Sequence, residues 1–207
     1  AHTLTLNRPL SEKIIIARGE VQTLPVAVFD EASAVSPLVF LRETELTQHD
    51  AAVAAFAAHF FERGTDTEAV LELARAIHAH VHYMPGSTEV HTTAREAFAL
   101  GAGVCQDQAH VFIAACRAQG VPVRYVSGYF FAPDAPELAS HAWADVCVDV
   151  AAQRWVSVDV THQCLTDERH VRLAVGVDYA ACAPVRGVRH GGGRESMQVT
   201  ITIRPFD

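Results

Sequence analysis

Hydrophobic residues in the middle of the chain recur every three or four positions, which is the spacing of one face of an α-helix. Three predicted helices precede residue 101, and they span 47–64, 67–81 and 93–100. A fourth predicted helix begins near Cys105, is largely apolar and ends at Gly120. Glycine is the usual residue just after a helix because it adopts the left-handed conformation without strain. The pattern therefore predicts a helical layer in this part of the chain.

After residue 120 the pattern changes to β-branched and alternating residues, which are typical of strands. Three strands are predicted in "VRYVSGYFF", "HAWADVCVDV" and "RWVSVDV", and a final pair in "HVRLAVG" and "MQVTITIRPF". Helices followed by antiparallel strands indicate the α+β class.

Residues 1–45 are also rich in β-branched residues and are interrupted by prolines. We therefore expect a short β-rich N-terminal segment over 1–45, followed by one larger domain over 46–207. A chain of 207 residues is long enough for one substantial domain with a small appendage.

The charge and composition exclude several classes of function. A net charge of −8 without a basic stripe argues against a nucleic acid or an anionic membrane as the main partner. No apolar run approaches the roughly 18 residues that cross a bilayer. The five cysteines are widely spaced and include no C-x-x-C pair, which suits a reducing compartment. With no secretory signal and no initiator methionine at the first residue, we expect a trimmed N-terminus and a cytoplasmic location.

Cys105 follows two glycines and begins the fourth predicted helix. The unpaired N–H groups of a helix start lower the pKa of a thiol, and the Cys105 N–H is a candidate donor to an oxyanion. Gly101 and Gly103 would let the chain turn sharply into the helix. These residues alone leave two interpretations open, because Cys105 is equally well explained as a small residue that packs a helix start.

His141 and Asp159 are candidates for the base and its orienting carboxylate. His141 opens one predicted strand and Asp159 ends the next, so a hairpin would return both residues to one end of the sheet. The two arms differ in length, so we expect a bulge or a tilt. His110 lies five residues after Cys105 on the same helix, about 140° around its axis, and is expected to face another neighbour.

Three segments of the chain, taken together, resemble a known family. They are "GVCQDQAHVFIAACRAQGVPVRYVSGYF", "SHAWADVCVD" with "RWVSVDVTH", and "RHVRLAVGVDYAACAPVRGV". In this order they are similar to the bacterial transglutaminase-like superfamily, whose members are often described as candidate cysteine proteases. The resemblance covers about residues 47–207 and implies that 46–207 form a transglutaminase-like catalytic domain. It implies a papain-like core in which helices pack on an antiparallel β-sheet. Residues 1–45 resemble only the tail end of the β-rich region that such proteins carry before this domain, so a partial N-terminal region is expected.

The resemblance also implies a catalytic triad. The cysteine of the G-V-C motif falls on Cys105, the histidine of the H-A-W motif on His141, and the aspartate closing the next strand on Asp159. The family usually continues that aspartate with proline, whereas this chain has Val160 followed by Thr161. This departure concerns the loop and leaves the three triad residues intact.

Two further residues are candidates for substrate binding. Trp143 shares a strand face with His141, so it is expected either to shield the imidazole or to wall a substrate groove, with core packing as the alternative. Gln106 lies in the first helical turn beside Cys105. Asp107, in the same turn, suits the helix dipole and is interpreted as structural.

A metal site built on His78, His80 and His82 is the other constellation considered. The three residues lie in the segment "HAHVH", but no nearby Glu or Cys completes a ligand set. A polar helix end is therefore the favoured interpretation, and we predict neither a metal nor another cofactor.

The sequence thus predicts a thiol enzyme of acyl transfer that acts on peptide or amide bonds, with a peptide or protein as substrate. Hydrolysis is the favoured outcome because water is the default acceptor. Transamidation and a non-catalytic peptide-binding domain with the same fold are the alternatives.

Overall fold

The computed structural model describes residues 5, 11–133, 140–187, 190–191 and 196–204. The helices of the first half are α1 (Ala51–Ala57), α2 (Thr67–His80), α3 (Ala94–Leu100) and α4 (Cys105–Ala118). They are preceded by the 3-10 turns η1 (Pro37–Leu41) and η2 (Glu45–Thr47) and joined late in the chain by α5 (Tyr179–Cys182). The four predicted helices are therefore present.

The first predicted helix is shorter than expected. Asp50, and not Thr47, caps α1, and its carboxylate accepts the N–H groups of Ala52 and Val53. Thr47 is buried in η2, where its hydroxyl accepts a hydrogen bond from Arg117 of α4. Thr47 thus serves a tertiary contact, and the chain enters the helix three residues later.

A six-stranded antiparallel sheet forms the second layer. Its strands are β1 (Val28–Asp30), β4 (Val123–Phe130), β5 (Ser140–Asp149), β6 (Arg154–Asp159), β7 (Cys164–Leu165) and β8 (His170–Gly176). The order is β1-β6-β5-β4-β8, with β7 also paired to β6. A separate pair consists of β2 (His82–Tyr83) and β3 (Ala102–Gly103). The predicted α+β class, with helices on an antiparallel sheet, is confirmed.

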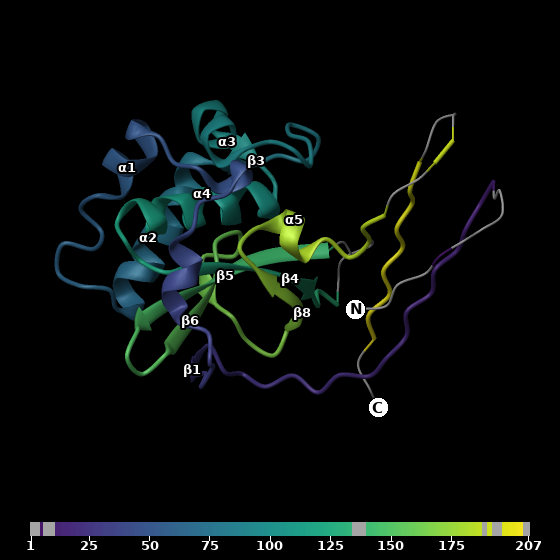
Figure 1. Ribbon diagram of the computed structural model, residues 1–207, viewed down its shortest axis with the longest axis horizontal. Helices are drawn as coiled ribbons and strands as arrows, with labels where there is room; N and C mark the ends of the chain where they lie inside the picture. The colour runs from purple at the N-terminus through teal and green to yellow at the C-terminus, as the bar shows by residue number, and fades with distance from the viewer. Residues whose placement is uncertain (1–4, 6–10, 134–139, 188–189, 192–195, 205–207) are drawn as a thin grey trace.

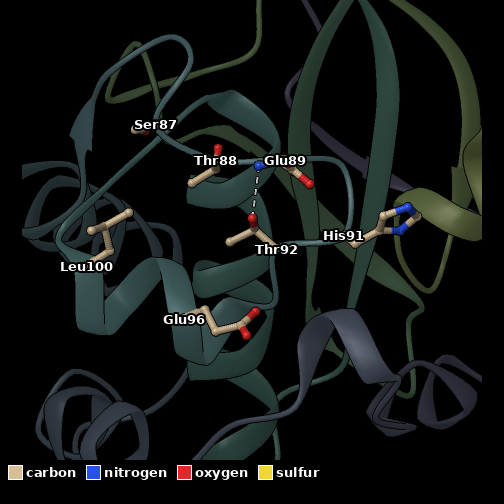
Figure 2. A pocket seen from close by; sticks show the side chains of 7 residues that line it. All are labelled: Ser87, Thr88, Glu89, His91, Thr92, Glu96 and Leu100. Carbon is tan, nitrogen blue, oxygen red and sulfur yellow. Dashed lines mark hydrogen bonds between the residues drawn. The ribbon is translucent and has the colours of Figure 1, made fainter.

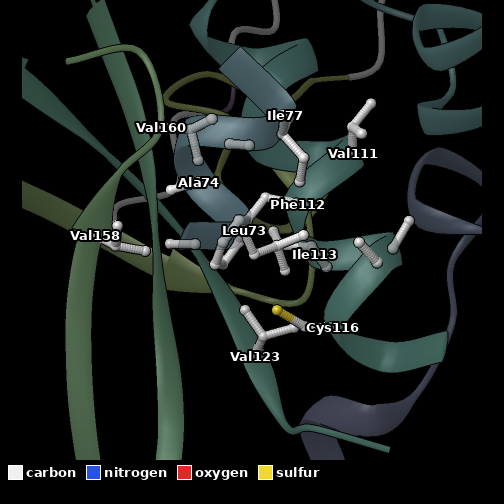
Figure 3. Packing of buried hydrophobic residues seen from close by; sticks show 14 of the residues in the cluster. Leu73, Ala74, Ile77, Val111, Phe112, Ile113, Cys116, Val123, Val158 and Val160 are labelled. Carbon is white, nitrogen blue, oxygen red and sulfur yellow. The ribbon is translucent and has the colours of Figure 1, made fainter. Parts of the chain in front are cut away.

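The helices gather on one side of the sheet, and α4 lies against its central strands (Figure 1). Figure 3 shows the core between them, where Leu73 and Ile77 of α2 meet Phe112 and Ile113 of α4 and, across the interface, Val158 of β6. All five side chains are fully buried. Because α4 packs against the central strands, Cys105 at its start is held in a fixed position relative to the sheet.

The terminal segments differ from the predictions. Between residues 11 and 27 the chain forms no regular strand, and its run of Ile14, Ile15 and Ile16 is exposed. The first ten residues of the expected β-rich segment lie, apart from Thr5, outside the described residues. Within 196–204 the structure has only an isolated bridge at Ile201, and β8 pairs with β4 instead. β-branched residues form strands where a sheet offers a partner, and these segments run away from the sheet (Figure 1).

The part of the N-terminal region nearest residue 45 belongs to the main sheet. Strand β1 pairs with β6, and Glu31 accepts two hydrogen bonds from the nearly buried Arg124 of β4. The expected β-rich segment is therefore reduced, within the described residues, to three strand residues that extend the sheet of residues 46–207.

Gly128 of β4 allows Trp143 of β5 to pack closely against the sheet. A Cβ at this position would overlap both the Trp143 ring and the carbonyl oxygen of Val171 on β8. We expect Gly128→Ala to lower the free energy of unfolding by roughly 3 kcal/mol, the upper end of overpacking effects. Urea denaturation checks this value. Gly19→Ala is the matched control because nothing lies within 4 Å of its added methyl group, and an equal effect of both substitutions would contradict the packing argument.

Candidate active site

Cys105 is the first residue of α4, and two glycines shape the turn that leads to it. Gly101 ends α3 with φ +68°, a left-handed conformation that favours glycine. At Gly103 a Cβ would lie 2.5 Å from the Cβ of Asp107. The chain can therefore pass from one helix directly into the next only with a glycine at the point of close approach.

Asp107 fixes the start of α4. Its Oδ2 accepts the N–H of Val104 at 2.8 Å and the hydroxyl of Thr88 at 2.6 Å. The side chain is 1 % exposed, and burial raises the pKa of its carboxyl group. Through these contacts Asp107 closes the first turn of α4 and holds the loop before α3. This agrees with its interpretation as a structural residue.

The Cys105 thiol is partly buried, and burial raises its pKa to about 11. Hydrogen bonds from the backbone N–H groups of Ala142 and Gln106 act in the opposite direction, while the charge of Asp159 raises the pKa further. The expected lowering by the helix start is thus outweighed by burial. The bond with Ala142 also places the sulfur beside the residue that follows His141.

His141 and Asp159 are joined by a hydrogen bond of 2.7 Å between Nε2 and Oδ2. Both side chains are buried, with 8 % and 0 % exposed. In the β5–β6 hairpin Ala144 pairs with Val158, so Asp159 lies diagonally across from His141. The expected bulge is present between Cys147 and Asp149. The structure therefore joins His141 and Asp159, and Cys105 lies near enough for the Asp159 charge to act on the pKa of its thiol.

Asp159 also accepts hydrogen bonds from two further imidazoles. Its Oδ2 is 2.6 Å from Nδ1 of His162 and 2.9 Å from Nε2 of His170, and its Oδ1 accepts the backbone N–H of His162 at 3.1 Å. Burial acts to raise the pKa of this carboxyl group. The hydrogen bonds from the three histidines outweigh burial and hold the pKa well below its usual range.

Sequence reasoning did not assign these two histidines a role. His162 lies three residues after Asp159, so the turn after β6 carries its ring back to the carboxylate. His170 begins β8 and pairs across the sheet with Phe130, the last residue of β4. The Phe130 ring stacks on His162 with centroids 4.0 Å apart. In the sequence, only the short interval from Asp159 to His162 could have indicated a contact with the carboxylate. The contact of His170 could not have been predicted in this way, because its position depends on strand pairing.

Trp143 and Gln106 were predicted to bind substrate. Trp143 is 1 % exposed, and its ring lies 6.0 Å from that of His141 and 5.3 Å from that of His170. This burial fits a residue that shields the imidazoles, and contact with a substrate would require the ring to move. Gln106 donates from Nε2 to the carbonyl of Val90 at 3.1 Å. A substrate role for either residue stays a prediction.

The histidines that were set aside have other surroundings. His110 is fully buried, accepts the N–H of Tyr179 through Nε2, and has its pKa lowered by burial to about 4. His80 bonds through Nε2 to the carbonyl of Phe98. Among the described residues, the structure contains one cluster of possible metal ligands, and His78, His80 and His82 are not part of it.

Two buried polar side chains set the position of α4 relative to the sheet. Gln108 donates to the carbonyl of Val81 at 2.8 Å and accepts the hydroxyl of Thr161, two residues after Asp159. Arg117 donates to the carbonyls of Phe40, Val123 and Val177 and to Thr47 Oγ1. Unsatisfied buried polar groups are costly, so these bonds strongly restrict how the helix can sit.

A shallow surface hollow lies beside the start of α4. Figure 2 shows its lining, which comes from the loop before α3 and from α3 itself: Ser87, Thr88, Glu89, His91, Thr92, Glu96 and Leu100. The hydroxyl of Thr92 accepts the N–H of Glu89 and holds the loop in its turn (Figure 2). Thr88 links this wall to Asp107, two residues from Cys105. The hollow is therefore next to the candidate site but does not contain its three residues.

The fold and the site define a class of protein in which a cysteine at a helix start meets a histidine–aspartate pair on an antiparallel sheet. The model of the transglutaminase-like superfamily core matches residues 55–160, more than half of the chain. The chain belongs to the transglutaminase-like superfamily.

Similar proteins agree with this assignment. A crystal structure of a putative cysteine protease from Cytophaga hutchinsonii is 31 % identical with a TM-score of 0.57, covering 70 % of this chain and 48 % of that one. The uncharacterized protein ML0607 of Mycobacterium leprae is 32 % identical over 79 % of this chain and 59 % of its own length. The uncharacterized protein Rv2569c of Mycobacterium tuberculosis is 34 % identical over 75 % of this chain and 53 % of its own length. The chain thus spans about half the length of these relatives.

None of the helices in the described part of the chain has the length and apolar character needed to cross a bilayer. The five cysteines, all within that part, are unpaired.

We expect Asp107→Ala to destabilise the protein by about 1–3 kcal/mol, the range for leaving a hydrogen-bond donor without its acceptor. The substitution removes the acceptor of both Val104 and Thr88. Chemical denaturation measures the loss, and amide hydrogen exchange should quicken at Val104. Gln106→Ala is the control, because Gln106 is the adjacent residue and its side-chain hydrogen bond to the Val90 carbonyl is exposed to solvent. If Asp107→Ala were as stable as this control, Asp107 would not be a cap.

Proposed function

We propose that this protein is a cysteine hydrolase that cleaves peptide or amide bonds with Cys105 as nucleophile, His141 as base and Asp159 as orienting carboxylate. The observation that carries the proposal is the buried 2.7 Å bond between His141 and Asp159, with Cys105 at the start of the helix that packs on the strand carrying His141. Nucleophile, base and orienting group in this arrangement are the elements of covalent acyl transfer.

Asp159 engages Nε2 of His141, so Nδ1 is the nitrogen left to take the thiol proton. The thiolate attacks the carbonyl carbon of the scissile amide and forms the C–S bond, while the carbonyl oxygen gains the negative charge. The N–H of Cys105 at the helix start is the proposed donor to that oxygen. When the C–N bond breaks, the imidazolium returns its proton to the leaving amine, which gives a thioester.

Water then resolves the thioester. His141 removes a proton from the water, the resulting hydroxide attacks the carbonyl carbon, and the C–S bond breaks to release the carboxylic acid. The proton returns to the sulfur through His141, which restores the resting site. A primary amine in place of water would give transamidation by the same steps.

The high pKa of the lone thiol is compatible with this mechanism. Burial opposes a single negative charge on Cys105. Transfer of the proton to His141 separates charge inside the site without changing its net charge, and the imidazolium lies between the thiolate and the Asp159 carboxylate. Burial therefore penalises the thiolate–imidazolium pair less than it penalises a lone thiolate.

We expect His141→Ala to shift the alkylation of Cys105 by iodoacetamide to alkaline pH. With the imidazole present, the thiolate–imidazolium pair reacts at pH 6–7. Without it, burial disfavours the thiolate at neutral pH, and the rate at pH 7 should fall at least tenfold. Peptide mass mapping after limiting reagent measures the rate at each pH.

Cys164 is an internal control for this experiment. It is also partly buried, and burial raises its pKa to about 11, as at Cys105. Cys105 should therefore react faster than Cys164 at neutral pH in the unmodified protein but not in His141→Ala. Equal rates for the two cysteines in the unmodified protein would refute the catalytic role of Cys105.

Hydrolysis is tested with a peptide library in water enriched in oxygen-18, with and without an added primary amine. We expect new carboxyl termini that carry the heavy oxygen, and no cleavage by Cys105→Ala. Products that carry the amine instead would assign transamidation. Retention of peptides without turnover would identify a binding domain.

A further inference from the structure

We propose a Zn²⁺ site formed by His141, Asp159, His162 and His170. Each residue offers one donor atom, and the four donor atoms lie within 4.8 Å of one another. Three of the four side chains are buried, and they come from two strands of the sheet and from the start of a third. The donors are therefore held by strand pairing and not by a surface loop alone.

The donor set has the chemistry that zinc prefers. Three imidazole nitrogens and one carboxylate oxygen are ordinary ligands in a four-coordinate site. With bonds of about 2.0–2.1 Å, tetrahedral ligands lie about 3.4 Å apart. The three nitrogens already surround Oδ2 of Asp159 at 2.6–2.9 Å. A side-chain rotation that withdraws this oxygen from the centre leaves room for an ion between the nitrogens.

Metal binding requires that each imidazole present a lone pair where it now donates an N–H to Asp159. The imidazole can remain neutral if its proton moves to the other ring nitrogen. In His170 that other nitrogen, Nδ1, accepts the backbone N–H of Asp167 at 3.1 Å and lies 3.0 Å from Oδ1 of the same residue. A proton that moves to Nδ1 replaces the bond from the backbone N–H with a bond to the Asp167 carboxylate. A carboxylate behind a histidine ligand is the outer-shell arrangement that orients metal-binding imidazoles.

The ligand rings are also held by packing, and one of them is accessible. Phe130 stacks on His162, and its ring centroid lies 5.0 Å from that of His170. The His162 side chain is 36 % exposed, whereas His141 and His170 are 8 % and 2 % exposed. An ion can therefore reach the cluster from the side of His162, and Asp159 offsets part of its charge in the buried site.

Zinc and the proposed triad cannot use His141 at the same time. The nitrogen that coordinates zinc is Nε2, which otherwise donates to Asp159. Zinc binding therefore removes the orienting bond and makes His141 a poorer base. This consequence rests on the function proposed above, whereas the binding site itself does not require Cys105 to be catalytic.

The test is calorimetric titration of the tag-free, metal-stripped protein with zinc chloride. We expect one Zn²⁺ per chain, and at least 100-fold weaker binding by His162→Gln. Asp167→Asn, which removes no ligand, should weaken binding 10- to 100-fold, as loss of an outer-shell partner does. Cys105→Ala and His82→Gln should bind zinc like the unmodified protein, because neither residue belongs to the cluster.

His162 is the most exposed of the four ligands, so His162→Gln is expected to fold, which circular dichroism checks. The proposal is wrong if the unmodified protein does not bind zinc at micromolar concentration or if His162→Gln binds it unchanged. Loss of binding in Cys105→Ala would place the ion between the thiol and His141 and would equally overturn the proposal. Cobalt provides an independent check, since a thiolate ligand adds a strong near-ultraviolet charge-transfer band that this site should lack.

A second readout separates the two proposals. Zinc should slow the alkylation of Cys105 at pH 7 at least tenfold in the unmodified protein, and a chelator should restore the rate. In His162→Gln, zinc at the same concentration should have little effect. Zinc binding without any change in alkylation would support the metal site and contradict the role of His141 as the base of Cys105.

Discussion

The candidate site depends on one buried carboxylate. Asp159 is fully buried and accepts hydrogen bonds from three imidazoles and one backbone N–H. A lone charge there would be strongly unfavourable, so the ionised carboxylate exists only because these donors surround it. The dependence is mutual, because each imidazole is oriented by the same oxygen. Strand β6, the turn after it and β8 are thus fixed relative to His141 of β5 by a single acceptor.

The nucleophile is placed by a second set of buried polar contacts. Asp107 closes the first turn of α4, Gln108 joins that helix to Thr161 beyond β6, and Arg117 anchors its other end. These contacts act at both ends of a helix whose middle is buried among apolar side chains. The helix therefore has little freedom to slide along the sheet, and Cys105 at its start keeps its position relative to strand β5.

The sequence was informative wherever local pattern determines structure. Helical spacing, glycines after helices and alternating strands predicted α2, α3, α4 and the β5–β6 hairpin, because each depends on neighbours close in the chain. The hairpin in turn placed His141 and Asp159 together. Within the described residues, the strands expected before residue 28 and after residue 195 do not form, since a β-branched run is only half of a strand pair. His170 was missed for a related reason: its contact with Asp159 depends on the pairing of β8 with β4, which no local pattern encodes.

A histidine base needs one carboxylate partner, and Asp159 has three histidine partners. The bonds from His162 and His170 do not position the Cys105 proton, and they withdraw electron density from the oxygen that His141 uses. Their presence makes Asp159 a weaker acceptor for His141 than a carboxylate with a single partner would be. The two extra bonds help to keep the buried carboxylate ionised, whereas orienting His141 needs only one of the three. Three convergent imidazoles beside a carboxylate, one of them backed by Asp167, also form the donor set that a divalent cation prefers.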